Sequence, residues 1–130
     1  MPAIQPDAPA LLDAAIDYLE RELLPTLAYY HRFQCRVTVN VLAQVRRELA
    51  LAPGHADAER ARLIALLGAD PDDPDRDRDA LSRELAARIR AGELALDDPA
   101  LLDHLRRSLV EALRINNPRW LADPDEPERR

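Results

Sequence analysis

The sequence contains no lysine, and all 18 of its basic residues are arginines. Aromatic residues make up only 4% of its 130 residues, and it has three glycines and one cysteine. A single Cys35 excludes an internal disulfide. The three glycines are scattered, which excludes a glycine-rich loop that could cradle phosphate. Because alanine, proline and aspartate are abundant, a GC-rich genome explains the missing lysine more simply than a set of arginine-specific phosphate sites.

Long apolar runs are also missing. No run approaches the roughly 20 residues that span a bilayer, and the N-terminus lacks the basic-then-apolar pattern of a secretion signal. The formal net charge of −6 and the lack of an aromatic platform beside basic residues argue against nucleic-acid binding. We therefore expect a cytoplasmic protein that binds neither membranes nor nucleic acid.

The negative charge is concentrated in two places. Residues 70–79 hold six Asp against two Arg, and residues 121–130 hold four acidic residues against two Arg. These segments contribute −4 and −2, so the other 110 residues are neutral overall. Such composition favours solvation and disorder. We expect an acidic linker at 69–79, a disordered tail at 122–130, and one folded domain over residues 1–121.

The apolar 47% of the chain is mostly Leu, Ala, Val and Ile, which suits helices packed on helices. The fold class predicted is all-α, a single-domain bundle of about five helices. Apolar periodicity and the positions of proline and glycine place these helices at about 7–24, 29–51, 57–67, 80–91 and 98–117.

Proline and glycine supply most of the predicted boundaries. Pro25 kinks or ends the first helix, and Pro53-Gly54 ends the second. Gly68 and Gly92 are the expected stops of the third and fourth helices. The valines at 37–45 also admit a strand, but the span of more than 20 residues and its charged ends favour a helix.

No pattern in the sequence points to catalysis. The histidines His31, His55 and His104 do not fall in metal-binding spacings. Cys35 reads as a buried structural cysteine, and the serines lack any context that would activate them. We predict no catalytic, cofactor-binding or metal-binding residues, and we expect that the protein is not an enzyme.

A polar stripe on the second helix is the first candidate contact site. Arg32, Arg36 and Asn40 recur every four residues, with Gln44 continuing the row. Asn40 lies among valines, where an unpartnered buried amide would cost about 1–3 kcal/mol. Either the stripe is paired inside the bundle, which we favour, or it faces a partner or ligand. In the ligand reading, the two arginines hold a phosphate and Asn40 orients the ligand.

The ending INNPRW is the second candidate. Asn116 is expected to end the helix in a left-handed conformation, and Pro118 should push Asn117 into an extended one. The favoured reading is structural, with Trp120 folding back as a clasp over the bundle. The alternative is that Arg119 and Trp120 form an anchor for a partner.

The stretch FQCRVTVN at 33–40 and the ending NPRW at 117–120 resemble a family of small bacterial helical proteins. That family is catalogued as a domain of unknown function, and its members look like companions of aminoglycoside-phosphotransferase-like kinases. In levulinate and related 4-hydroxy-acid catabolism those kinases phosphorylate a hydroxyacyl-CoA. The resemblance covers roughly residues 9–120 and carries over no catalytic residue.

The resemblance implies a non-catalytic accessory subunit whose partner is such a kinase. Two other functions stay open, namely a helical domain that binds a small molecule or acyl-CoA, and a structural homodimer without its own ligand. The candidate contact residues are Arg32, Arg36, Asn40, Asn117, Arg119 and Trp120.

Overall fold

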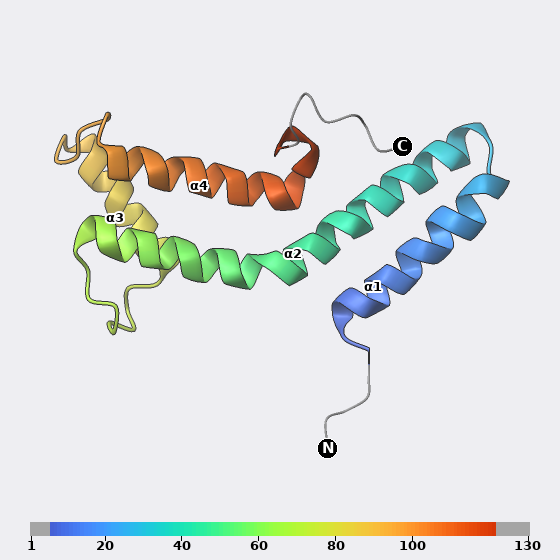
Figure 1. Ribbon diagram of the computed structural model, residues 1–130, viewed down its shortest axis with the longest axis horizontal. Coiled ribbons are helices and arrows are strands. Elements are labelled where there is room, and N and C mark those ends of the chain that lie inside the picture. The colour runs from blue at the N-terminus through green and yellow to red at the C-terminus, as the bar shows by residue number, and fades with distance from the viewer. Residues whose placement is uncertain (1–5, 122–130) are drawn as a thin grey trace, which may run out of the picture. The chain divides into compact units, whose positions relative to one another are not determined.

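The computed structural model describes residues 6–121, and within that range the chain forms only helices and turns (Figure 1). The all-α prediction is therefore confirmed. The α-helices are α1 (Ala8–Asp17), α2 (Tyr29–Leu67), α3 (Arg78–Arg90) and α4 (Pro99–Asn116). Contacts group the chain into two compact units, Met1–Ala52 and Pro53–Arg130, and each is described by itself.

The predicted stop at Pro53-Gly54 is wrong, because α2 is one helix of 39 residues with Pro53 inside it. The second and third predicted helices are thus a single element. A proline at this position removes the hydrogen bond to the carbonyl of Leu49. The flanking Ala, Leu, His and Glu residues tolerate helical geometry, and they carry the helix through. The free-energy cost of this missing hydrogen bond falls at Pro53, which is the first residue of the second unit.

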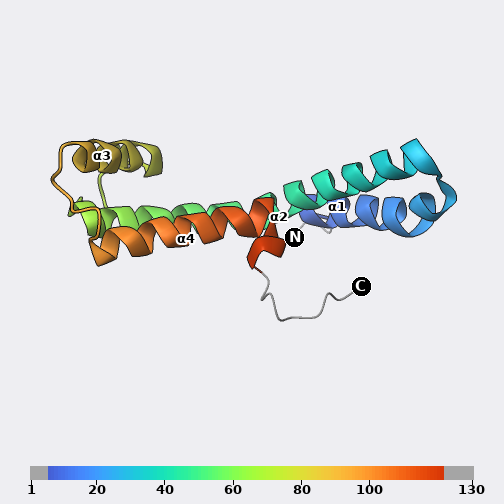
Figure 2. The same ribbon diagram turned by 90° about the horizontal axis from the view of Figure 1, so that it is seen from above.

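In unit Met1–Ala52, α1 lies alongside the first part of α2 as a helical hairpin (Figures 1 and 2). Asp7 caps α1 by accepting a hydrogen bond from the backbone N–H of Ala10 at 2.9 Å. After α1 the chain continues as a π-helical segment, Tyr18–Leu23, and a 3-10 turn, Leu24–Thr26. Pro25, within this turn, ends the first helix as predicted.

The two arms of the hairpin meet through few buried side chains. Cys35 and Val39 are the buried apolar residues described in this unit. The Cys35 thiol donates to the carbonyl of Leu19 across a sulfur–oxygen distance of 3.7 Å. Arg46 donates to Asp13 at 2.5 Å. The acidic side of α1 and the basic side of α2 therefore meet within one hairpin.

Unit Pro53–Arg130 contains the larger core. Its buried residues come from the end of α2, from α3, from the start of α4 and from the segment after α2, namely Leu63, Leu67, Ala69, Leu81, Leu85 and Leu101. Three of these leucines, Leu63, Leu81 and Leu101, are almost completely buried. Because each comes from a different helix, they join α2, α3 and α4 at one point (Figure 2).

Helices α2 and α3 end next to Gly68 and Gly92, as the sequence predicts. Gly68 and Gly92 have φ of 64° and 73°, a left-handed backbone conformation that residues with a Cβ atom rarely adopt. The N–H of Ala69 bonds the carbonyl of Ile64, and the N–H of Glu93 bonds that of Arg88. These are the six-to-one bonds of the Schellman motif, and they direct the chain back toward the core.

The linker at 69–79, expected to favour disorder, instead forms hydrogen-bonded turns. The side chains of Asp70 and Asp73 accept from backbone N–H groups two residues on, at 2.9 and 3.0 Å. Each pair encloses a proline, so DPDDPD folds as two successive Asx turns. Arg60 of α2 then donates to the carbonyls of Pro71 and Arg76. The prediction was wrong because composition does not register these local bonds.

The end of α4 differs from the expectation in one respect. Asn116 remains in the helix, and no left-handed residue follows it. Asn117 leaves helical geometry ahead of Pro118 as predicted, but at φ −157° and ψ 74° it lies outside the extended region that was expected. A 3-10 turn, Pro118–Leu121, comes next. The predicted disordered tail at 122–130 lies outside the described residues.

Substitution of Asp98 tests the start of α4. This side chain accepts from the N–H groups of Ala100 and Leu101, and Leu101 belongs to the core. We expect Asp98→Ala to lower the free energy of unfolding by about 1 kcal/mol, measured by urea denaturation. The matched control is Asp97→Ala, one residue earlier and outside the cap. Equal effects of the two substitutions would contradict the capping role.

Candidate functional site

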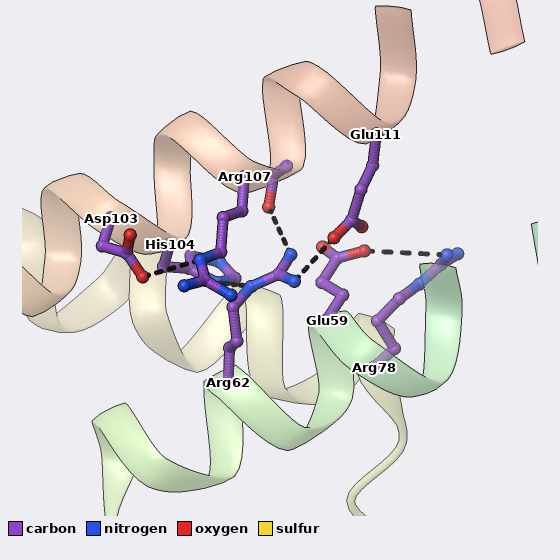
Figure 3. A network of polar contacts seen from close by, with 8 residues as sticks. Glu59, Arg62, Arg78, Asp103, His104, Arg107 and Glu111 are labelled. Atoms are coloured by element: carbon purple, nitrogen blue, oxygen red, sulfur yellow. Dashed lines mark hydrogen bonds and ion pairs between the residues drawn. The ribbon is translucent and has the colours of Figure 1, made fainter. Parts of the chain in front are cut away.

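A buried guanidinium gathers the polar side chains of unit Pro53–Arg130. It belongs to Arg62 of α2, and it faces His104, Ser108 and Glu111 of α4 (Figure 3). The spacing of four and then three residues places these α4 side chains on one side of the helix. We call these four residues the Arg62 network.

Each α4 side chain accepts a separate hydrogen bond from Arg62. Its Nε donates to Nδ1 of His104 at 3.2 Å, and Nη2 donates to Oγ of Ser108 at 3.3 Å. Nη1 lies 2.6 Å from Oε1 of Glu111 in an ion pair. The side chains of Arg62 and Glu111 are only 16% and 15% exposed. The pair is therefore a largely desolvated and well-satisfied salt bridge.

His104 is the one polar residue that is fully buried among those described. Burial lowers the pKa of its imidazole below the usual 6.5, and the nearby positive charge of Arg62 lowers it further. Because Nδ1 accepts from Arg62, the neutral ring carries its proton on Nε2. His104 is thus a neutral acceptor within the network.

Two further ion pairs flank the network (Figure 3). Arg107 pairs with Asp103 of the same helix at 2.9 Å, and Arg78 approaches Glu59 of α2 at 3.8 Å. The Arg78–Glu59 pair ties α3 to α2 as the Arg62 network ties α4 to it. No hydrogen bond joins Ser108 to His104 among the residues described, since both accept from Arg62. The arrangement is a structural clamp between helices.

A shallow depression of about 320 Å³ lies on another side of α4. It is lined by Asp103, Arg106, Arg107, Val110, Glu111 and Arg114. The two carboxylates are already paired, with Arg107 and with Arg62. Arg106 and Arg114 have no ion pair within residues 6–121, so the depression is positively charged. It is chemically suited to an anion, although it is open and exposed.

The predicted polar stripe is exposed. Arg32, Arg36 and Asn40 lie on the solvent side of α2 in unit Met1–Ala52. The favoured internal pairing of Asn40 is wrong, because its amide faces solvent and has no hydrogen-bond partner within the part of the chain described. The stripe avoids the helix side that carries Cys35 and Val39. The alternative, that it faces a partner or ligand, stays a prediction.

The other predicted residues, Asn117, Arg119 and Trp120, lie in unit Pro53–Arg130 at the end of α4. The structural reading of Trp120 as a clasp is wrong, since 76% of this residue is exposed. Trp120 lies in the 3-10 turn after Asn117 and is not part of the described core. The structure thus gathers the candidate residues into two separate groups, one in each unit.

Exposure is in fact shared by every aromatic residue of the chain. Tyr18, Tyr29, Tyr30, Phe33 and Trp120 are between 53% and 93% exposed. Exposed leucines follow the same trend on α4, where Leu102, Leu105 and Leu109 form a row. Spacings of three and four residues put this row on one side of α4, about 140° away from His104. The clamp faces α2, so this leucine row faces outward.

Sequence reasoning missed the Arg62 network. The signal available was the spacing of His104, Ser108 and Glu111, which repeats a polar side chain on one face of an otherwise leucine-rich helix. The sequence pattern treats His104 only as a possible metal ligand and Ser108 only as a possible nucleophile. The partner on α2, 42 residues away from His104, could not be identified by periodicity.

The pH dependence of stability tests the burial of neutral His104. Unfolded chains take up a proton near pH 6.5, whereas the folded imidazole resists it. Stability is therefore full above about pH 6.5 and falls as the pH drops through the folded pKa. We expect the free energy of unfolding to decline from pH 7 to pH 5 in the natural protein, with a shallower decline in His104→Gln.

His31→Gln is the control, because His31 is exposed on α2. It should keep the natural slope, as followed by urea denaturation at each pH. If His104→Gln and the natural protein have the same slope, His104 does not carry the pH dependence.

Comparisons with known proteins place the chain only at the level of a family. The DUF6285 family model, described as a domain of unknown function, matches residues 25–120. No curated protein and no solved structure matches the chain. Within residues 6–121 no helix combines the length and hydropathy needed to cross a membrane. Nor do three or more His, Cys, Asp or Glu side chains of that range gather as a metal site.

Proposed function

We propose that this chain, which belongs to the DUF6285 family, is a non-catalytic accessory subunit that binds a phosphotransferase-like kinase acting on a hydroxyacyl-CoA or a related small molecule. The observation that supports an interaction role is the exposure of every aromatic residue in the chain. Aromatic side chains bury the most apolar area per residue, and they are enriched among the residues that dominate binding energy.

The leucine row of α4 is the proposed kinase-binding face. Leu102, Leu105 and Leu109 are between 43% and 66% exposed, and Trp120 follows at the end of the same helix. An amphipathic helix with anchors three and four residues apart fits the groove of a partner protein. The Arg62 network holds the opposite side of α4 on α2, so the leucine row is presented from a fixed support.

The kinase itself is proposed from the resemblance of the 33–40 and 117–120 stretches, and the reaction belongs to that partner. A second function is favoured by one observation, the exposure of Arg32, Arg36 and Asn40 within two turns of α2. Two guanidinium groups so placed suit the phosphates of an acyl-CoA. A thermal shift with CoA thioesters that disappears in the Arg32→Ala, Arg36→Ala double variant would favour this function over the first.

Co-purification tests the accessory role. The chain is co-expressed with a phosphotransferase-like kinase that acts on a hydroxyacyl-CoA, and we expect a stable complex and altered kinase activity. Leu105→Glu should abolish the complex, because it buries an unpaired carboxylate. Trp120→Ala should weaken it by more than tenfold, as removal of an aromatic anchor does.

Arg83→Ala, an exposed substitution on α3, is the control that should bind as the natural chain does. Trp120→Ala should change the free energy of unfolding by less than about 0.5 kcal/mol, because the indole is mostly exposed. The absence of any complex, together with kinase activity that does not respond to the chain, would reject the proposal.

A further inference from the structure

The helical hairpin of unit Met1–Ala52 has an extended apolar surface on which no other described residue of that unit packs. It is formed by eight exposed residues of α1, the π segment and α2, namely Leu11, Tyr18, Tyr30, Phe33, Val37, Val41, Val45 and Leu49. We call this set the hairpin face. On α2 it follows a spacing of three and then four residues, so it winds along one side over about five turns.

Helix geometry places both arms of the hairpin in this face. The two arms contact each other through the helix side that carries Leu19 on one arm and the helix side that carries Cys35 and Val39 on the other. At 100° per residue, Leu11 and Tyr18 turn away from that contact in the same direction as Val41 and Val45 do on the antiparallel arm. Phe33 and Val37 continue the surface around the outer side of α2.

Most charged residues lie on the other side of the hairpin. The ion pair between Arg46 and Asp13 bridges the two arms there, and Arg32, Arg36 and Asn40 lie on the same flank. The hairpin therefore has one charged side, whose charges already pair between its own arms, and one mostly apolar side, which no other described part of the unit covers.

The hairpin has too small a core to be stable alone. Cys35 and Val39 are its only buried apolar residues within the described part of the unit. A two-helix hairpin buries one stripe of each helix, and a stable bundle needs a second layer on the remaining apolar surface. Two such hairpins face to face form a four-helix bundle, in which each hairpin supplies the missing layer of the other.

The area available agrees with pairing of this kind. The side chains of the hairpin face together expose on the order of 700 Å², against roughly 800 Å² per partner in a standard protein interface. The face is mostly apolar, with the carboxylates of Glu22 and Glu48 near its two ends, so its apolar middle can meet itself across a two-fold axis.

Net charge at the edges favours a second copy as the occupant. Residues 10–24 carry four acidic side chains and one arginine, a net of −3, whereas residues 29–51 carry four arginines and one glutamate, a net of +3. In a four-helix bundle the net-acidic arm of one copy can lie beside the net-basic arm of the other, so long-range repulsion between two copies is small, although the Arg46–Asp13 pair itself lies on the outer flank.

We propose that unit Met1–Ala52 pairs with the same unit of a second chain through the hairpin face, forming an antiparallel four-helix bundle. This pairing does not depend on the kinase, because the proposed kinase-binding face is the leucine row of α4. The dimer displays two copies of that row, and a kinase complex of matching stoichiometry follows.

The full chain is first examined alone, by size-exclusion chromatography with light scattering at about 100 µM. A mass of twice the 14.6 kDa chain is expected. A monomer at that concentration overturns the proposal, whatever the kinase experiment gives. Dilution should dissociate the dimer, with a parallel loss of helical circular dichroism as the hairpins lose their second layer.

Three substitutions locate the contact. Val41→Glu places a carboxylate at the middle of the hairpin face, and we expect it to shift the protein to monomer, with the dissociation constant raised by at least a hundredfold. Asn40→Glu adds the same charge one position away on the charged flank, and it should leave the dimer intact. Leu105→Glu should also stay dimeric. A dimer that survives Val41→Glu but not Leu105→Glu forms through α4, and this overturns the proposal.

Cysteine cross-linking covers the case in which Val41→Glu unfolds the hairpin. With Cys35 replaced by serine, single cysteines at 37, 41 and 45 are oxidised in turn. At least one should give a disulfide-linked dimer, because residues near the two-fold axis meet their own copies. A cysteine at Asn40 should not. Cross-linking at 40 alone, or at none of the four positions, overturns the proposed face.

Discussion

The constraint on which this structure depends is that its helices have more apolar sides than the chain covers. Eight apolar residues are buried among those described, and six of them form one cluster around Leu63, Leu81 and Leu101. The exposed valines of α2 and the leucine row of α4, which are as apolar as the core residues, stay outside it. A chain with few aromatics and small buried side chains would ordinarily keep its largest residues inside. Here all five aromatic residues are exposed, and much of the apolar surface lies outside the core.

Against this apolar background, one polar cluster fixes how α4 lies on α2. Arg62 supplies donors in three directions, and each donor reaches a different residue of α4. A guanidinium has a rigid planar geometry, so three simultaneous bonds are compatible with only one register of the two helices. The leucine core around Leu101 would tolerate sliding by a turn, whereas the Arg62 network would not. The outward direction of the leucine row is a consequence of this inward clamp.

The neutral state of His104 belongs to the same arrangement. A charged imidazole beside Arg62 would bring two positive charges together in a site that excludes water. Glu111 offsets the guanidinium instead, and Ser108 satisfies its remaining donor. The clamp therefore carries close to zero net charge. This allows it to lie next to the leucine cluster, where an uncompensated charge would be costly.

Most signals for helix ends in the sequence were reliable. The helix starts near Asp7 and Asp98 and the stops at Gly68 and Gly92 lie where the sequence places them, and Asn117 leaves the helix before Pro118, although not in the extended conformation expected. The same reasoning failed at Pro53, because a helix-breaking residue imposes a penalty without determining whether the flanking helix absorbs it. It also failed for the acidic linker, whose Asx turns depend on which carboxylate meets which N–H.

The sequence by itself singled out Arg32, Arg36 and Asn40 and the Arg119-Trp120 ending, but it favoured an internal setting for both groups and did not identify the Arg62 network. Helical class, most boundaries and the amphipathic pattern follow from periodicity, because neighbours three and four residues apart share a side. Which apolar side is buried was decided only in three dimensions, since one stripe packs and another of equal hydrophobicity does not. The hydrogen bond between Arg62 and His104 was also decided only by the tertiary structure. A contact between two helices depends on how they pack, and it produces no periodic pattern in the sequence of either helix.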